Sequence, residues 1–448
     1  MSFEWLSAEW LSPEWWGILS LVVLFGAIFI GFPIAFTLIF VALTFGYFVL
    51  GPLALYLMTL QVFSVMKDTA LAAVPFFLFM GYLLEQSGLM ERLFRAIQLM
   101  LAGLRGSLYL AVLATATIFA AATGIVGSSV TLLGVMAAPT MKRSGYDVRL
   151  SAGAITAGGT LGILIPPSIM LIVMGPVVGV PATDLFAAAV IPGLLLAGLY
   201  MAYTLIRCHI NPALGPALPM EERAGSWQEI ARELIFGCVP IVVVIMATLG
   251  VILMGIATPT DAGAVGAFAV FLLTLVYRKL SWDGFKRALM STLEVSSMIL
   301  LLVAASNFFG AVFSRMGSPT LIAESLLTLN YSPTLMLLLI LAIIFVLGWP
   351  LEWVPIVLIV IPILLPLVDK LGIDKVWFCI LVAVCLQTAW LSPPVALSAY
   401  FLKGVVPDWD LKDIYFGMMQ FMVLQVIGLL MVLAWPELAL WLPRVLRD

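Results

Sequence analysis

Two glycines and two serines stand together inside a long apolar run, in the stretch TGIVGSS at 123–129. Gly124 and Gly127 loosen a helix, and Ser128 and Ser129 follow with hydroxyl groups. Backbone groups released from a helix within a membrane can coordinate Na⁺, or can meet a carboxylate at the positive end of a half-helix. Small residues also favour close packing of helices, so this pattern alone supports both interpretations.

Paired prolines interrupt two further apolar runs. Pro166 and Pro167 end the stretch GGTLGILIPPS, and Pro393 and Pro394 end the stretch LQTAWLSPP. Consecutive prolines remove two amide donors and restrict the residue before them, so each helix should break there. A simple kink needs only one proline. The doubled break, present twice, therefore favours a functional role.

A carboxylate also lies between apolar runs, in the stretch GWPLE that runs from Gly348 to Glu352. An ionisable group at membrane depth is expensive and is a functional hypothesis by default. Glu352 can instead extend to the membrane interface. Asn307, in the stretch AASNF, is predicted to lie at the tip of a hairpin, with helix packing as the alternative.

The composition indicates a membrane protein. Of the 448 residues, 63% are hydrophobic and 10% are charged, far from the average for soluble chains. The net charge of -3 offers no basic field for nucleic acid. The only histidine, His209, lies at the end of an apolar run, and the four cysteines form no C-x-x-C pair. We expect the cysteines to pack as small hydrophobes, and we expect no enzymatic activity.

Uncharged runs predict ten to twelve membrane segments in an all-α polytopic protein. The N-terminal residues 1–16 combine acidic residues with tryptophans and should lie at the membrane interface. The first transmembrane repeat is predicted at 17–206, with a hairpin at about 69–95. A polar connector follows at 207–233. The second repeat is predicted at 234–436, with a hairpin at about 295–325, and the tail at 437–448.

Landmarks that recur at a nearly constant offset support a duplication. Gly-Tyr-Asp at 145–147 and Gly-Ile-Asp at 372–374 lie 227 positions apart, as do the two proline pairs. Duplicated halves with broken helices are typical of secondary transporters, in which the halves may be inverted. Assigning loops to two faces puts the equivalent loops on opposite sides, as inversion requires. It divides the Lys and Arg residues equally, so the positive-inside rule leaves the orientation open.

With these motifs in view, the sequence resembles the large membrane subunit of TRAP transporters, the tripartite ATP-independent periplasmic family. The resemblance covers most of the chain in six ordered blocks: VPFFLFMGYLLEQSG (74–88), ATGIVGSS (122–129), GYD with GGTLGILIPPS (145–168), AAAVIPGLLLAGLY (187–200), ATPTDAGAVGAF (257–268) and LQTAWLSPP (386–394). It implies an elevator-type secondary transporter built from two inverted repeats with re-entrant hairpins and broken helices. It also implies a bacterial inner membrane location.

The resemblance further implies import driven by Na⁺ rather than ATP, with no other cofactor. The expected partners are a small four-helix membrane subunit, a periplasmic substrate-binding protein and a small organic acid such as a dicarboxylate, a 2-oxo acid or lactate. The hairpin tips would lie near Pro75 and Asn307. Na⁺ would bind through backbone carbonyls and hydroxyls near Ser128, Ser129, Thr388 and Ser392. The full set implied for ions and substrate is Gly124, Gly127, Ser128, Ser129, Pro166, Pro167, Gly348, Glu352, Thr388, Ser392, Pro393 and Pro394.

Two other functions compete with this hypothesis. A self-sufficient carrier of di- or tricarboxylates could share the hairpin architecture and use no binding protein, and only the family motifs separate it from the first hypothesis. A membrane-embedded enzyme would need acids, histidines or cysteines gathered at one depth. The isolated His209 argues against the enzyme.

Overall fold

The computed structural model describes residues 11–219, 227–393 and 396–447, and these segments are helical. Eight helices among them are long and apolar enough to cross a membrane, fewer than the ten to twelve predicted. The difference arises because several apolar runs fold as shorter paired helices. The first half contains α1 (Pro13–Ile30), α2 (Ile34–Leu50), α3 (Leu53–Lys67), α4 (Ala73–Gln86), α5 (Leu89–Leu101), α6 (Ser107–Thr123), α7 (Val126–Arg143), α8 (Val148–Leu164), α9 (Ile169–Val178) and α10 (Ala182–Ile210).

After the short η3 (Pro212–Leu214), the second half repeats this pattern. Helix α11 runs through one π-helical turn into α12, and α17 runs through another into α18. The elements are α11 (Trp227–Ile245), η5 (Met246–Gly250), α12 (Val251–Leu253), α13 (Pro259–Val276), α14 (Trp282–Arg315), α15 (Ser318–Leu327), α16 (Pro333–Gly348), α17 (Trp353–Pro355), η6 (Ile356–Val360), α18 (Ile361–Lys370), α19 (Lys375–Gln387), η7 (Thr388–Trp390), α20 (Leu397–Val405), α21 (Leu411–Ala434) and α22 (Glu437–Arg447).

Equivalent helices of the two halves begin at the offset that the sequence landmarks indicate. Helix α7 begins at Val126 and α17 at Trp353, 227 positions later. Gly88 and Gly317, 229 positions apart, both adopt a left-handed conformation directly before α5 and α15. The duplication therefore extends from short motifs to whole helices. The predicted tail after residue 436 forms α22, which packs against α10.

Helices α6 and α7 form a re-entrant hairpin whose tip is Gly124-Ile125. The start of α6 lies beside the segment that follows α7, because Tyr109 donates to the backbone oxygen of Asp147 at 3.4 Å. The Ser107 and Tyr146 hydroxyl groups also lie 3.3 Å apart. Both helices therefore reach the same face of the protein. In the second half, α16 and the continuous helix from α17 to α18 occupy the equivalent position, with a tip at 349–352.

The hairpin tips consequently lie elsewhere than the sequence interpretation placed them. Pro75 lies in the first turn of α4. Backbone amides in the first turn have no partner within the helix, so a proline there costs no helical hydrogen bond. Asn307 lies inside α14, which continues without a break for 34 residues. The prediction of a tip at Asn307 is therefore wrong. Helices α4 and α5 do meet at an angle of 62°, at Ser87-Gly88.

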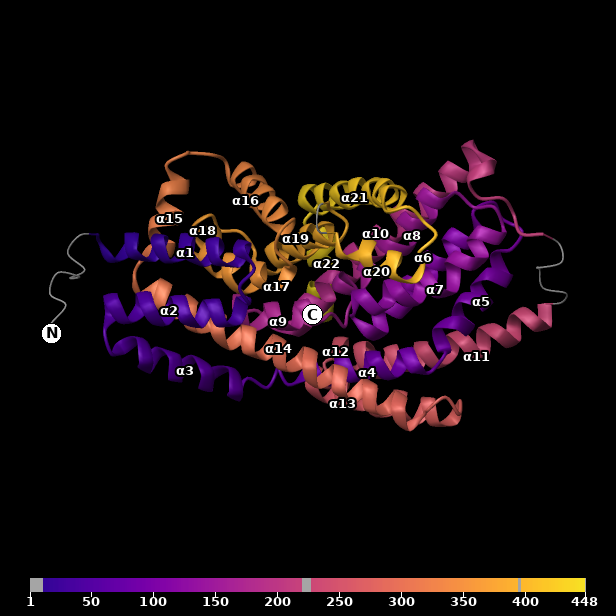
Figure 1. The fold of residues 1–448 in the computed structure, drawn as a ribbon, viewed down its shortest axis with the longest axis horizontal. Helices are drawn as coiled ribbons and strands as arrows, with labels where there is room; N and C mark the ends of the chain where they lie inside the picture. The colour runs from indigo at the N-terminus through magenta and orange to yellow at the C-terminus, as the bar shows by residue number, and fades with distance from the viewer. Residues whose placement is uncertain (1–10, 220–226, 394–395, 448) are drawn as a thin grey trace.

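Two groups of helices divide the molecule (Figure 1). We call α1–α5 and α11–α15 the frame; within it α14 packs against α2, α3 and α4, and α13 packs against α4. We call α6–α10 and α16–α22 the hairpin body; within it α8 packs against α6, α7 and α21. Figure 1 shows the two hairpins on opposite sides of the view, α6 and α7 to the right and α16 to α18 to the left, with α9 next to α17 near the centre.

The contacts between loops revise the division of basic residues between two faces. Lys142 pairs with Asp408 at 2.6 Å, and Arg149 pairs with Asp413 at 2.7 Å, so the loop before α21 lies beside the end of α7. The Arg92 guanidinium lies over the Tyr277 ring, which brings α5 to the end of α13. The sequence interpretation had put these partners on opposite faces.

One face therefore carries most of the basic residues, and we call it the basic face. Among the described residues it holds Arg92, Arg95, Arg105, Lys142, Arg143, Arg149, Arg207, Arg232, Arg278, Lys279, Lys286, Arg287, Lys403 and Lys412. The opposite face holds Arg315, Lys370, Lys375, Arg444 and Arg447. Ser318 donates to the backbone oxygen of Glu14 at 2.9 Å, so the start of α1 lies at this opposite face. The equal division expected from the sequence is wrong.

Candidate functional site: a cavity between the frame and the hairpin body

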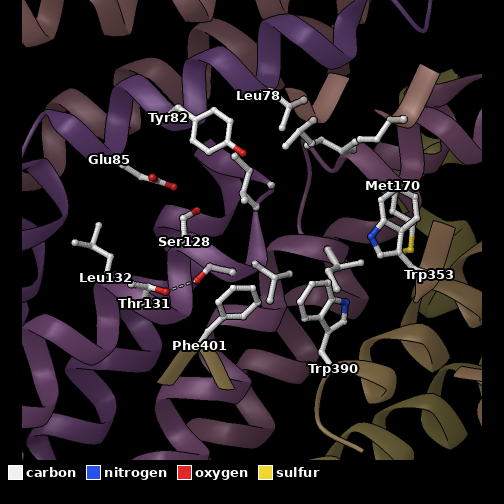
Figure 2. Close-up of a pocket in the computed structure, with 18 of the residues that line it drawn as sticks. Leu78, Tyr82, Glu85, Ser128, Thr131, Leu132, Met170, Trp353, Trp390 and Phe401 are labelled. Atoms are coloured by element: carbon white, nitrogen blue, oxygen red, sulfur yellow. Dashed lines mark hydrogen bonds between the residues drawn. The ribbon is translucent and has the colours of Figure 1, made fainter. Parts of the chain in front are cut away.

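A cavity of about 740 Å³ lies where the hairpin body meets the frame (Figure 2). The frame contributes residues of α4 and α14. The hairpin body contributes both hairpin tips and both broken helices. The lining residues are Leu78, Tyr82, Glu85, Gln86, Gly124, Ile125, Val126, Gly127, Ser128, Thr131, Leu132, Val135, Ile163, Ile169, Met170, Val295, Met298, Ile299, Glu352, Trp353, Val354, Trp390 and Phe401.

The first hairpin tip packs directly onto the first helix break. Gly124 has φ +64°, and a Cβ atom at this position would lie 2.7 Å from the backbone oxygen of Pro167. Both the conformation and the space require glycine. The break itself runs from Ile165 to Ser168, between α8 and α9, and contains a cis bond between Pro166 and Pro167. The paired prolines thus end a helix as the sequence predicts.

The second hairpin tip meets the second break in a similar way. A Cβ atom on Gly348 would lie 3.3 Å from that of Ala389, in the 3₁₀ turn that follows α19. Beyond the tip, Glu352 precedes the helix that starts at Trp353, and its side chain is exposed and lines the cavity. Both hairpin tips and both helix breaks therefore contribute to one cavity. Gly124 and Glu352 represent the tips in its lining, and Met170 and Trp390 represent the breaks.

The residues singled out from the sequence divide into two groups. Gly124, Gly127, Ser128 and Glu352 line the cavity. The others lie behind its wall. The hydroxyl groups of this second group donate to nearby backbone oxygens: Ser129 to Ile125, Thr388 to Cys385 and Ser392 to Thr388, each at 2.6 Å. Pro166 and Pro167 are buried, and Pro393 is half-buried. Pro394 lies outside the described residues.

The sequence interpretation missed the frame's contribution to the cavity. Leu78, Tyr82 and Glu85 form one stripe along α4, at the spacing of a single helix face. Figure 2 shows the Glu85 carboxylate extending toward the Ser128 hydroxyl, across the boundary between the frame and the hairpin body. Buried oxygens of both side chains have no hydrogen-bond partner. The helical spacing was a usable signal, but Glu85 was interpreted as the charged end of a hairpin.

Helix N-termini give the cavity wall a favourable potential for an anion. Helix α7 begins at Val126, α9 begins at Ile169, and the continuous helix from α17 to α18 begins at Trp353. All three of these residues line the cavity. None of their N-cap residues uses its side chain to cap the helix. Unpaired amide groups and the helix dipole place partial positive charge at such ends. The wall can therefore hold a carboxylate without a basic side chain.

Residues 21–438 match the family described as "Tripartite ATP-independent periplasmic transporter, DctM component". The chain belongs to this family. The chain is 30% identical to the C4-dicarboxylate TRAP transporter large permease protein DctM of Rhodobacter capsulatus, over 93% of this chain and 96% of the relative. It is 28% identical to the sialic acid TRAP transporter large permease protein SiaM of Vibrio cholerae, over 94% of this chain and 96% of the relative.

This protein is thus a TRAP transporter large permease and a multi-pass membrane protein. Among solved structures, the YdaH transporter of Alcanivorax borkumensis, described as having an unusual topology, matches with a TM-score of 0.63 at 15% sequence identity. The match covers 85% of this chain and 88% of that chain. At this identity the likeness concerns the fold alone, and it agrees with the predicted all-α polytopic fold.

Proposed function

We propose that this TRAP permease imports a small organic acid across the bacterial inner membrane, coupled to Na⁺. A periplasmic binding protein delivers the substrate, and a small four-helix membrane subunit completes the permease. The observation that best supports this proposal is the cavity between the frame and the hairpin body, because both hairpin tips and both helix breaks contribute to its lining. Sliding of the hairpin body along the frame, as in an elevator, would expose such a cavity to each side in turn.

The oxygen atoms at the helix breaks support Na⁺ as the coupling ion. Ser129, Thr388 and Ser392 place hydroxyl oxygens beside backbone carbonyls at the first hairpin tip and the second helix break. Ser128 adds a hydroxyl oxygen that lines the cavity. Hard cations prefer such oxygen ligands. The described residues contain no group of three or more His, Cys, Asp or Glu side chains suited to a transition metal. Na⁺ enters here as a transported ion, so no resident cofactor is required.

The basic face supports an orientation for import. Cytoplasmic loops carry an excess of Lys and Arg, so the basic face would be cytoplasmic and the start of α1 periplasmic. The opposite face would then meet the binding protein. The second hairpin, formed by α16 and α17–α18, would approach the cavity from this periplasmic side, because Lys370 at its outer end lies on the opposite face, 3.5 Å from Glu324.

The uncapped helix ends at the cavity wall support a carboxylate substrate. The named relatives transport chemically different acids, including C4-dicarboxylates and sialic acid. They therefore support the class of organic acids more strongly than any one member.

Gly127 provides the test of this function. A Cβ atom at Gly127 would lie 2.9 Å from the Phe401 ring, so a leucine there would fill the cavity between the first hairpin and α20. Na⁺-gradient-driven uptake by the complete transporter in proteoliposomes should be lost in Gly127→Leu. Gly198→Leu is the control, because no atom lies within 4 Å of a Cβ there. Unchanged Na⁺-dependent uptake in Gly127→Leu would refute the proposal.

The alternative is a self-sufficient carrier of di- or tricarboxylates. Purification of the chain from its native membrane in mild detergent separates the two functions. Recovery of a small membrane protein of about four spans supports the tripartite transporter. Na⁺-driven uptake by the chain alone in proteoliposomes would support the self-sufficient carrier.

A further inference from the structure

The charges around the cavity restrict the substrate more narrowly than the family does. Among the described lining residues, the acidic side chains are Glu85 and Glu352, and none of the lining residues is Lys, Arg or His. An anion therefore meets two carboxyl groups and no basic side chain. A single substrate carboxylate can be balanced by the helix end at Val126 together with a coupling cation. A second carboxylate would find no basic side chain in this lining, and like charges repel strongly in a site of low dielectric.

The opposite end of the cavity is aromatic. Figure 2 shows Trp353 and Trp390 on the side away from Tyr82, Glu85 and Ser128, with the Phe401 ring between Trp390 and Ser128. The rings of Trp390 and Phe401 are stacked, with centroids 6.5 Å apart and planes 25° apart. Aromatic side chains of this kind offer a large apolar contact area to a ring or a branched chain. The cavity is thus amphipathic, with the Tyr82 and Ser128 hydroxyl groups and the Glu85 carboxyl group at one end and the indole rings of Trp353 and Trp390 at the other.

The size of the cavity agrees with this division. Its volume of about 740 Å³ lies within the range of sites for drug-sized ligands, about 300–1,000 Å³. Such a site suits a ligand with an acid group at one end and an extended apolar body. A compact C4-dicarboxylate would leave the aromatic wall without contacts.

We propose that the substrate is a monocarboxylate with an aromatic or branched apolar body. Its carboxylate binds beside the N-terminus of α7, near Ser128, and its body packs against Trp353, Trp390 and Phe401. Trp390 and Phe401 are thereby specificity-determining residues. The inference rests on the proposed function, because it assumes that the cavity holds the transported organic acid.

Four acids test this inference, because they vary the number of carboxylate groups and the presence of a phenyl ring independently. The probes are butanoate, 3-phenylpropanoate, succinate and phenylsuccinate. Their binding to the purified full-length chain is measured by calorimetry, with and without Na⁺. We expect 3-phenylpropanoate to bind at least about tenfold more tightly than succinate or butanoate, which is about 1.4 kcal/mol. Phenylsuccinate should bind more weakly than 3-phenylpropanoate.

Variants at the aromatic end supply the second measurement. Phe401→Ala and Trp390→Ala should reduce the affinity for 3-phenylpropanoate about tenfold and leave that for butanoate nearly unchanged, because only the ring contacts are lost. Phe40→Ala is the matched control, since Phe40 lies on α2 with 68% of its surface exposed. Na⁺-dependent binding of succinate at least as tight as that of 3-phenylpropanoate would overturn the inference alone. Absence of Na⁺-dependent binding for all four acids would overturn the proposed function as well.

Discussion

The side-chain amide of Gln387 donates to the backbone oxygen of Thr160 at 3.3 Å, and these two residues are equivalents, 227 positions apart in the two repeats. A residue that contacts its own counterpart must lie close to the axis that relates the repeats. Thr160 lies in α8 and Gln387 at the end of α19, and both are fully buried. The pseudo-twofold axis therefore passes between the two broken helices, next to the hairpin tips. This places the cavity near the centre of the duplicated architecture.

Replacing Gln387 with leucine should destabilise the protein without creating a cavity in the core. The change removes the donor to Thr160 at nearly constant volume, and a lost buried hydrogen bond costs about 1 kcal/mol. The thermal midpoint of the purified chain in detergent should fall measurably. Gln61→Leu, at a half-buried position on α3, should leave the midpoint unchanged. Equal midpoints for Gln387→Leu and the wild-type chain would show that the contact does not stabilise the axis.

The sequence predicted those features that depend on local chemistry. Paired prolines must break a helix, and Pro166-Pro167 does so. Gly124 was predicted to loosen a helix, and it ends α6 in a left-handed conformation; that it forms a hairpin tip was not predicted. The hairpin tip predicted at Asn307 falls inside α14 for a different reason. Charges in a sequence indicate where a chain reaches water, but they do not show which loops share a face. That information required tertiary contacts such as the one between Lys142 and Asp408.

The contribution of α4 to the cavity was missed for a related reason, although the helical spacing of Leu78, Tyr82 and Glu85 was a usable signal. Glu85 stands near the end of an apolar run and close to other charges, so its sequence surroundings resemble those of an ordinary loop. Its role depends on the packing of the frame against α7, which brings Ser128 opposite. Contacts between the frame and the hairpin body join residues far apart in the chain, so local sequence patterns give little indication of them.

Gly145 and Gly372 provide a test of the orientation. They are equivalent positions on opposite faces, both have positive φ, and no atom lies within 4 Å of a Cβ at either. In a variant with the native cysteines changed to alanine, a membrane-impermeant maleimide should label Gly372→Cys in intact spheroplasts. It should label Gly145→Cys only in inverted vesicles, because cytoplasmic loops are enriched in basic residues. Labelling of both from the same side would contradict the inversion of the repeats.

Gly124 and Gly145 separate the effect of backbone conformation from that of packing at the hairpin tip. Their φ angles are +64° and +70°, so alanine introduces similar backbone strain of about 1 kcal/mol at either position. Only at Gly124 would the new Cβ also lie 2.7 Å from the backbone oxygen of Pro167. The clash should push the hairpin tip away from the first helix break and distort the cavity wall.

Na⁺-driven uptake should therefore fall at least about tenfold in Gly124→Ala, equivalent to about 1.4 kcal/mol, and change little in Gly145→Ala. Thermal midpoints of both variants show whether each remains folded, so a loss of uptake with matched midpoints assigns the defect to the cavity. Similar losses of uptake in the two variants would attribute the effect to backbone strain. The contact between the first hairpin tip and the paired prolines would then have no specific role in transport.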